Sequence, residues 1–234
     1  MPEADAIPPA LRVDGLDHTV YVPASEPERG AEIAAHLDSP GRSLWQRVSW
    51  LHPWQIVVEL GSGFGEMMVA VPLPSASRLV AVESSDADVR LLRRSLEENL
   101  RQIDFFEIAF SVQASGSSGL AAVASSVFDP VDVQNACFRI GWQLDAVEVM
   151  EQLASMLTGF TRWSVIVSLA GLDAQRVSEL ARGRFLFLMD RRTHKFVRIS
   201  SGLSAPAVAR MLDSGWLYTD EAVLLSSAEQ AGTW

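Results

Sequence analysis

The stretch QIVVELGSGFGEMMVAV, residues 55–71, decides the fold because it predicts a strand, a glycine-rich turn and a helix in direct succession. Its apolar run ends at the acid Glu59, and three glycines then occupy every second position, at Gly61, Gly63 and Gly65. Glycine has no side chain, so the backbone of such a turn can approach a ligand closely and direct its N–H groups at it. We therefore expect a ligand-binding turn at the end of this strand.

Predicted strands and helices alternate along the rest of the chain, in the pattern of an open α/β sheet. Apolar residues recur at helical spacing over 86–103, and the run at 163–171 is apolar throughout, as in a strand buried on both faces. The predicted fold is a Rossmann-like, mostly parallel sheet of seven strands, with helices on both faces and an antiparallel C-terminal strand. Its strands are expected at 55–60, 78–84, 105–111, 163–171, 184–190, 195–200 and 221–227.

Domain boundaries follow from local composition. Residues 1–17 are expected to form a flexible N-terminal segment, because the chain starts with several prolines and few apolar anchors. Residues 18–234 are expected to form one domain, in which 18–54 make an N-terminal cap and 55–234 make the Rossmann-like core. The small polar residues of 112–141 predict a loop over a site or a weak edge hairpin.

The overall composition narrows the class of partner. The chain has 234 residues, of which 48 % are hydrophobic and 21 % charged, and its formal net charge is −10. This charge disfavours a nucleic-acid backbone and an anionic membrane surface as partners. The sequence has no apolar run long enough to cross a membrane and no secretory leader pattern, and its lone cysteine, Cys137, fits a reducing compartment. A cytoplasmic location is therefore expected.

Two ligand classes compete for the glycine turn. Dinucleotide sites have the spacing G-x-G-x-x-G, but Glu66 stands here at the position of the third glycine and would face a pyrophosphate unfavourably. The order E-L-G-S-G-F-G resembles motif I of the class I S-adenosylmethionine-dependent methyltransferases. A tight structural turn followed by a solvated carboxylate is the alternative to both.

The resemblance to these methyltransferases implies S-adenosyl-L-methionine as cofactor, a ligand that carries a sulfonium cation and no phosphate. Glu59 would suit its cationic part, and Glu83, at the end of the strand predicted at 78–84, would accept hydrogen bonds from its ribose. The four histidines lie apart in the sequence, without metal-ligand spacing, so no metal site is expected. The implied cofactor-binding residues are Glu59, Gly61, Ser62, Gly63, Gly65, Glu83, Ser84 and Ser111.

A narrower and looser resemblance covers roughly residues 18–225. The strand TVYVP at 19–23, the helix after Glu83 and the helix start QLD at 143–145 resemble the FkbM-type methyltransferases, O-methyltransferases of sugar and natural-product tailoring. This resemblance implies methyl transfer to a hydroxyl group of a small molecule or sugar, with no nucleic-acid or membrane partner. The chain could act as a homo-oligomer or within a larger multidomain assembly.

One departure from the family concerns a KIDVEG-like segment on its fourth strand, which supplies two acids near the cofactor and the acceptor. The aligned stretch here is VIVSLAGLD, 165–173, in which Ser168 and Ala170 replace the acids and Asp173 is expected to cap a helix. No catalytic residue is identified. An active methyltransferase and a catalytically degenerate, methyltransferase-like accessory or interaction domain both stay open, with a nucleotide-binding oxidoreductase as a third class.

The acceptor pocket is expected beside the N-terminal helices of 28–51 and the Gly/Ser segment 112–128, because both adjoin the strand ends that carry the cofactor residues. Trp45, Trp50 and Trp54 belong to this N-terminal part. They either pack the cap onto the sheet or form an aromatic wall for the acceptor.

Overall fold

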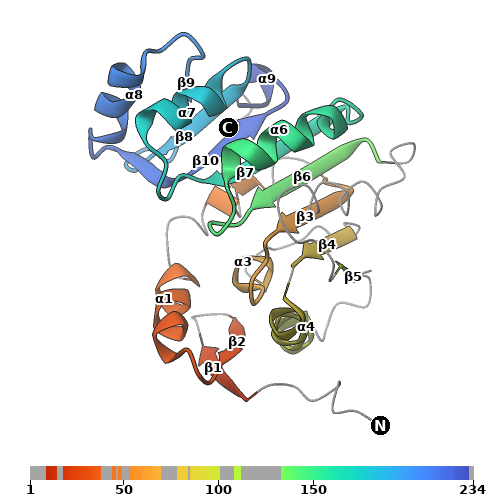
Figure 1. The fold of residues 1–234 in the computed structure, drawn as a ribbon. Helices are drawn as coiled ribbons and strands as arrows, with labels where there is room; N and C mark the ends of the chain where they lie inside the picture. Colours follow the sequence, from red (N-terminus) through yellow and green to blue (C-terminus); the bar gives the residue numbers. More distant parts are fainter. Residues whose placement is uncertain are drawn as a thin grey trace.

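The structure, a computed structural model, describes residues 9–14, 18–37, 44–45, 47–48, 53–69, 78–83, 85–100, 108–111 and 133–231. Among these residues, eight strands form one main sheet in the order β5-β4-β3-β6-β7-β10-β8-β9 (Figure 1). The bounds of these strands are β3 (Ile56–Leu60), β4 (Arg78–Val82), β5 (Ile108–Ser111), β6 (Asn135–Ile140), β7 (Arg162–Ser168), β8 (Phe185–Asp190), β9 (Phe196–Ile199) and β10 (Leu217–Leu225).

The strand directions confirm the predicted sheet. Strands β5, β4, β3, β6 and β7 are parallel, and β10 pairs antiparallel with both β7 and β8. These seven strands make the mostly parallel sheet with an antiparallel C-terminal strand. The remaining strand, β9, extends the edge by pairing antiparallel with β8.

Helices cover both faces of the sheet, as predicted (Figure 1). On one face, α6, α7 and α8 pack against alternate strand residues such as Val58 and Phe138. On the other face, α3 and α4 pack against the intervening residues, such as Val57 and Cys137. Side chains alternate between the two faces of a strand, so each central strand contributes to both cores. The helices are α1 (Pro27–Leu37), α3 (Glu66–Val69), α4 (Asp86–Leu100), α6 (Ala146–Leu157), α7 (Ala174–Ala181), α8 (Ala205–Leu212) and α9 (Ala228–Ala231).

Within the described parts of the chain, no helix has the length and apolar character that spanning a bilayer requires.

The N-terminal part contains a hairpin where residues 1–17 were expected to be flexible. Strand β1 (Ala10–Asp14) pairs antiparallel with β2 (Thr19–Pro23), and the N–H of Tyr21 donates to Ser95 Oγ on α4 at 2.9 Å. The expectation is therefore corrected for residues 10–14. A strand of five residues with only partly buried side chains gives a weak signal by itself, because its pairing comes from β2 and not from its own apolar pattern.

Strand β6 corrects the strand assignment at the centre of the sheet. Residues 112–141 were expected to form a loop or an edge hairpin, but Asn135–Ile140 lies between β3 and β7. The expectation is wrong because the short run NACFRI contains Arg139, and arginine is seldom fully buried unless it is paired. Here Arg139 is buried and paired, so a strand with a charged residue occupies a central position.

Candidate functional site

The glycine turn follows directly from the end of β3. Gly61, Gly63 and Gly65 have backbone φ angles of +67°, +54° and +84°, in the left-handed region that favours glycine. The N–H groups of Gly61 and Ser62 donate to the carbonyl oxygen of Val82 at 2.8 and 3.3 Å, which ties the turn to the end of β4. The turn therefore lies at the carboxyl ends of two neighbouring parallel strands, where α/β sheets bind ligands.

The strand order reverses beside this turn. Strands β4 and β5 continue the sheet on one side of β3, whereas β6 and β7 continue it on the other. The chain after β6 approaches the turn closely: the N–H of Gly141 donates to the carbonyl oxygen of Leu60 at 2.8 Å, and a Cβ on Gly141 would collide with the carbonyl oxygen of Gly61. Gln143 Nε2 donates to that same Gly61 oxygen at 2.6 Å. The turn is thus held by β6 as well as by β4.

Replacing Gly141 with alanine should destabilise the protein by about 1–3 kcal/mol, because two backbone segments would have to separate to admit the Cβ. Gly202 is the matched control, since no atom lies within 4 Å of the position that its Cβ would take. Urea unfolding of both variants measures the difference. Equal stabilities for Gly141→Ala and Gly202→Ala would show that this close approach does not constrain the fold.

Glu83 lies against the glycine turn. Its side chain is buried, and Oε2 accepts a hydrogen bond from the N–H of Gly63 at 2.9 Å. Oε1 accepts a longer hydrogen bond, 3.4 Å, from the N–H of Ser85 just before α4. The carboxylate of Glu83, just after β4, therefore accepts hydrogen bonds both from the glycine turn and from the residue before α4.

The other implied cofactor residues are the serines Ser62, Ser84 and Ser111. Ser62 is buried within the turn. Ser111 ends β5 beside Val82, one strand farther from the turn, and its side chain is not described. Ser84 lies outside the described residues.

A buried ion-pair cluster joins the end of β3 to β6 and β10. Arg139 donates from Nη1 to Glu59 Oε1 at 2.5 Å and from Nη2 to Glu221 Oε1 at 2.7 Å, and all three side chains are at most 3 % exposed. Burial alone would lower the pKa of Arg139, but the carboxylates of Glu221 and Glu59 raise it above its usual value, so Arg139 stays charged. Burial raises the pKa of Glu59, and the charge of Arg139 opposes that shift. The acid expected to face a cofactor cation is thus engaged by Arg139.

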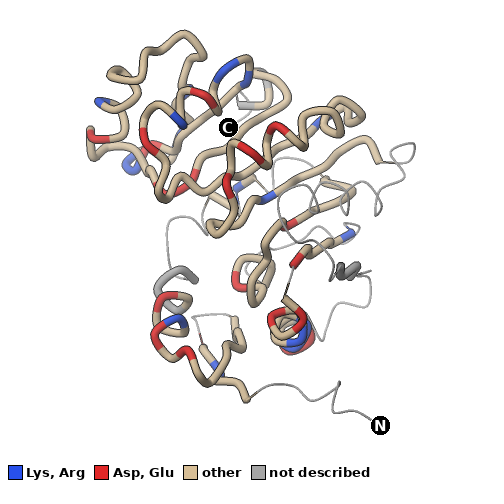
Figure 2. Tube along the Cα trace, viewed as in Figure 1, with Lys and Arg blue, Asp and Glu red and all other residues tan. Residues whose placement is uncertain are grey.

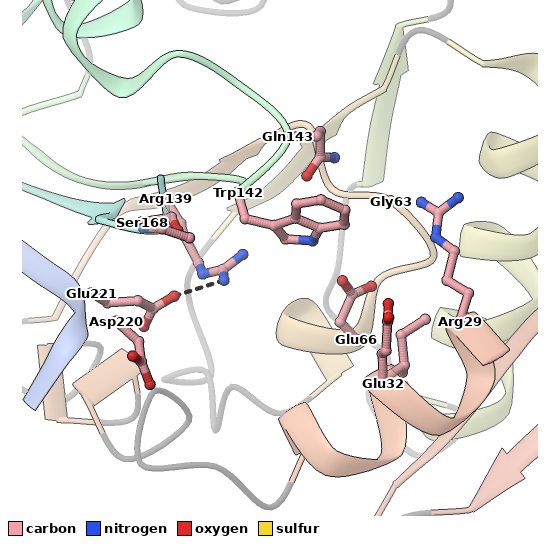
Figure 3. A pocket seen from close by; sticks show the side chains of 12 residues that line it. Arg29, Glu32, Gly63, Glu66, Arg139, Trp142, Gln143, Ser168, Asp220 and Glu221 are labelled. Atoms are coloured by element: carbon pink, nitrogen blue, oxygen red, sulfur yellow. Dashed lines mark hydrogen bonds and ion pairs between the residues drawn. The ribbon is translucent and has the colours of Figure 1, made fainter. Parts of the chain in front are cut away.

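A cavity of about 440 Å³ opens beside these groups (Figure 3). Gly63 and Glu66 lie on one side of it, and Asp220 and Glu221 lie on the other. Trp142, which is 51 % exposed, projects between them from the loop after β6. Cavities of this size accommodate small organic ligands.

Helix α1 supplies another part of the cavity wall. Arg29, Glu32 and Ile33 line the cavity, so part of the expected N-terminal cover, 28–51, borders it. The second expected cover, 112–128, lies outside the described residues.

Two of the N-terminal tryptophans pack in the core. Trp45 and Trp54 are buried, and their Nε1 groups donate to the carbonyl oxygens of Met67 and Val48 at 2.9 and 2.8 Å. The packing interpretation is therefore confirmed for these two residues, whereas Trp50 lies outside the described residues.

The fourth parallel strand in chain order is β6, and the stretch aligned with the KIDVEG segment forms β7. Placed on β6, that segment matches its Lys and Ile to Arg139 and Ile140, and its two acids to Gly141 and Gln143. The alignment with VIVSLAGLD is therefore wrong by one strand, and the two acids are missing in either placement. Asp173 caps α7, as expected, by accepting from the N–H of Arg176 at 2.9 Å.

Strand β10 supplies two acids that line the cavity. Asp220 and Glu221 line it, and the strand register sets Glu221 beside Ser168 of β7. Sequence reasoning missed these residues, together with Arg139 and Trp142. The available signal was the acid pair inside the otherwise strand-like run LYTDEAVLL.

No protein-family model and no curated protein matches the sequence. Solved structures do match. A methyltransferase from Geobacter sulfurreducens is 17 % identical with a TM-score of 0.50, and the match covers 87 % of this chain and 89 % of that protein. A candidate O-methyltransferase from Klebsiella pneumoniae is 11 % identical with a TM-score of 0.51, and covers 85 % of this chain and 87 % of that protein. The chain has a methyltransferase fold. In this methyltransferase fold, the glycine turn, Glu83 and the cavity share the carboxyl edge of the parallel strands.

Proposed function

We propose that this protein is an S-adenosyl-L-methionine-dependent methyltransferase that acts on a hydroxyl group of a small molecule or sugar. One observation carries the proposal. The glycine turn presents a left-handed Gly63 to the cavity, and the carboxylate of Glu83 lies 2.9 Å from its N–H. A glycine-rich turn after β3 and an acid after β4, the first two parallel strands in chain order, are the two features that an adenosyl cofactor needs.

The residues present fit this cofactor better than a dinucleotide. Gly63 leaves open the space that a side chain would fill, and Glu83 can exchange its hydrogen bond with the turn for bonds from two ribose hydroxyls. Glu66, on the same side of the cavity, would repel a pyrophosphate but attract a cation. The cofactor supplies a methyl group on a sulfonium sulfur. Glu59 is buried and paired with Arg139, so we infer that it supports the site through Arg139.

The remaining task of the protein is to hold the acceptor in line with that methyl group. Positioning of this kind contributes a large part of the rate acceleration when two reactants must meet in one geometry. The wall opposite the glycine turn carries Ser168, Asp220 and Glu221, whose oxygens can hold polar groups of an acceptor. Trp142 can pack against its apolar part.

A catalytically degenerate binding domain is the second candidate. The observation that favours it is the pair Gly141 and Gln143 in the loop directly after β6, the fourth parallel strand, where the resembling family carries acids. Such a domain would bind S-adenosylhomocysteine but would not consume S-adenosylmethionine with any acceptor. Binding and turnover measured on the same preparation separate the two candidates.

The variant Gly63→Val tests the proposed site. It should weaken S-adenosylhomocysteine at least about 100-fold, or about 2.8 kcal/mol, because the side chain would occupy the cavity wall that the cofactor needs. The left-handed φ of Gly63 strains a valine by roughly 1–2 kcal/mol, but the fold should survive, since its Cβ would come no nearer than 3.5 Å to Glu66.

Gly183→Val is the matched control for backbone strain. Gly183 also has a left-handed φ, +69°, with no atom within 4 Å of its added Cβ, and it does not line the cavity. Gly183→Val should bind S-adenosylhomocysteine with the affinity of the unchanged protein. Calorimetry that finds the same affinity for Gly63→Val would mean that the turn is only structural.

A further inference from the structure

The cavity has an excess of negative charge. Among the described residues, four carboxylates line it, against two guanidinium groups. Both guanidinium groups are already engaged: Arg139 pairs with Glu59 and Glu221, and Arg29 lies 4.4 Å from the ring centre of Phe64 and 3.1 Å from a Glu26 oxygen. Figure 2 shows acidic positions on α1, on α3 and in β10, the elements that surround the cavity. The carboxylates are Glu32, Glu66, Asp220 and Glu221.

One carboxylate oxygen of Glu221 lacks a hydrogen-bond donor among the described residues. Its Oε1 accepts from Arg139, but its Oε2 is buried and has no hydrogen-bond partner among the residues that the structure describes. A buried polar atom without a partner is costly, so a ligand N–H beside it would relieve that cost.

Trp142 projects into the cavity, and Figure 3 shows the guanidinium group of Arg139 between its indole ring and the carboxylate of Glu221. The Trp142 side chain is 51 % exposed and lines the cavity. The face of an indole ring attracts cations, most strongly where water is partly excluded. The aromatic ring and the carboxylates therefore favour the same kind of ligand.

We propose that the methyl acceptor carries a protonated amine in addition to its hydroxyl group, and that this amine binds in the cavity beside Trp142 and the wall formed by Asp220 and Glu221. The inference rests on the proposed function, because it names the acceptor class of the same site. Acceptors with a carboxylate or phosphate are excluded by repulsion from this wall.

Three fragments of matched size test the charge preference: 2-phenylethylamine, 2-phenylethanol and phenylacetate. Ligand-observed NMR should show the amine binding at least about tenfold more tightly than the alcohol, and the carboxylate binding more weakly than both. Asp220 is exposed, so its substitution should not disturb the core. Asp220→Asn should remove most of the preference for the amine and leave the affinity for the alcohol unchanged. Asp213→Asn removes an acid that does not line this cavity and should change nothing.

Titrations on the same samples distinguish a failure of this inference from a failure of the proposed function. The fragments are titrated with and without saturating S-adenosylhomocysteine, whose own binding is measured first. If S-adenosylhomocysteine binds but the amine does not, or if the carboxylate binds as well as the amine, the acceptor inference is overturned and the proposed function stands. An amine preference that persists in both Asp220→Asn and Trp142→Ala also overturns it. If S-adenosylhomocysteine fails to bind, the proposed function fails.

Discussion

Replacing Arg139 with methionine is expected to lower the free energy of unfolding by about 3–5 kcal/mol. The substitution leaves the carboxylates of Glu59 and Glu221 buried without their shared cation, each at most 3 % exposed. Removing one member of a buried charge cluster costs more than the cluster contributes, because the remaining charges keep their desolvation penalty. Urea unfolding followed by circular dichroism measures the loss.

The triple variant Glu59→Gln, Arg139→Met, Glu221→Gln is the control for this prediction. It removes all three charges and keeps side chains of similar size, so it should regain most of the lost stability, to within about 1–2 kcal/mol of the unchanged protein. If Arg139→Met alone were as stable as the unchanged protein, the cluster would not be the buried network described above. If the triple variant were no better than the single one, packing and not charge would explain the loss.

Replacing Glu83 with alanine is expected to weaken S-adenosylmethionine by roughly one to three orders of magnitude. A carboxylate can accept one hydrogen bond from each ribose hydroxyl, and bonds to a charged acceptor contribute about 1.5–3 kcal/mol each, where about 1.4 kcal/mol is tenfold. Glu83→Gln should lose less, because it keeps one acceptor oxygen. Calorimetric titration of the two variants and the unchanged protein gives the order of affinities.

Stability measured on Glu83→Ala separates two roles of this residue. The carboxylate also accepts from Gly63 and, more weakly, from Ser85, so a loss of about 0.5–1.5 kcal/mol of unfolding free energy is expected even without ligand. A ligand role requires that affinity fall by more than this. Reduced stability with unchanged affinity would assign Glu83 to the turn and helix start alone.

The sequence predicted those parts of the fold whose signals are local. The runs IVVEL, RLVAV and RWSVIVS are buried strands with few interruptions, and their assignment needed no knowledge of neighbours. Strand β6 was missed because Arg139 makes its run resemble a surface segment, and its burial depends on acids from two other strands. Strand β1 was missed because its few apolar residues matter only once β2 lies beside it.

Within the candidate site too, only the residues with local sequence signals could be predicted. The three glycines and Glu83 could be predicted because a turn sequence and the end of the next strand carry the relevant signal. The contacts of Arg139 could not, because they join residues 80 and 82 positions apart in the chain. No spacing rule connects the end of β3 to the middle of β10, and the acids of β10 reach the cavity only through the antiparallel register with β7.

The most direct test of the central claim, that the glycine turn binds an adenosyl cofactor, is calorimetric titration of the unchanged protein with S-adenosylhomocysteine and, in parallel, with NADH. We expect S-adenosylhomocysteine to bind at a single site and NADH to give no binding, because Glu66 lines the cavity beside Gly63 and would repel a pyrophosphate. Tight binding of NADH with no response to S-adenosylhomocysteine would contradict the account.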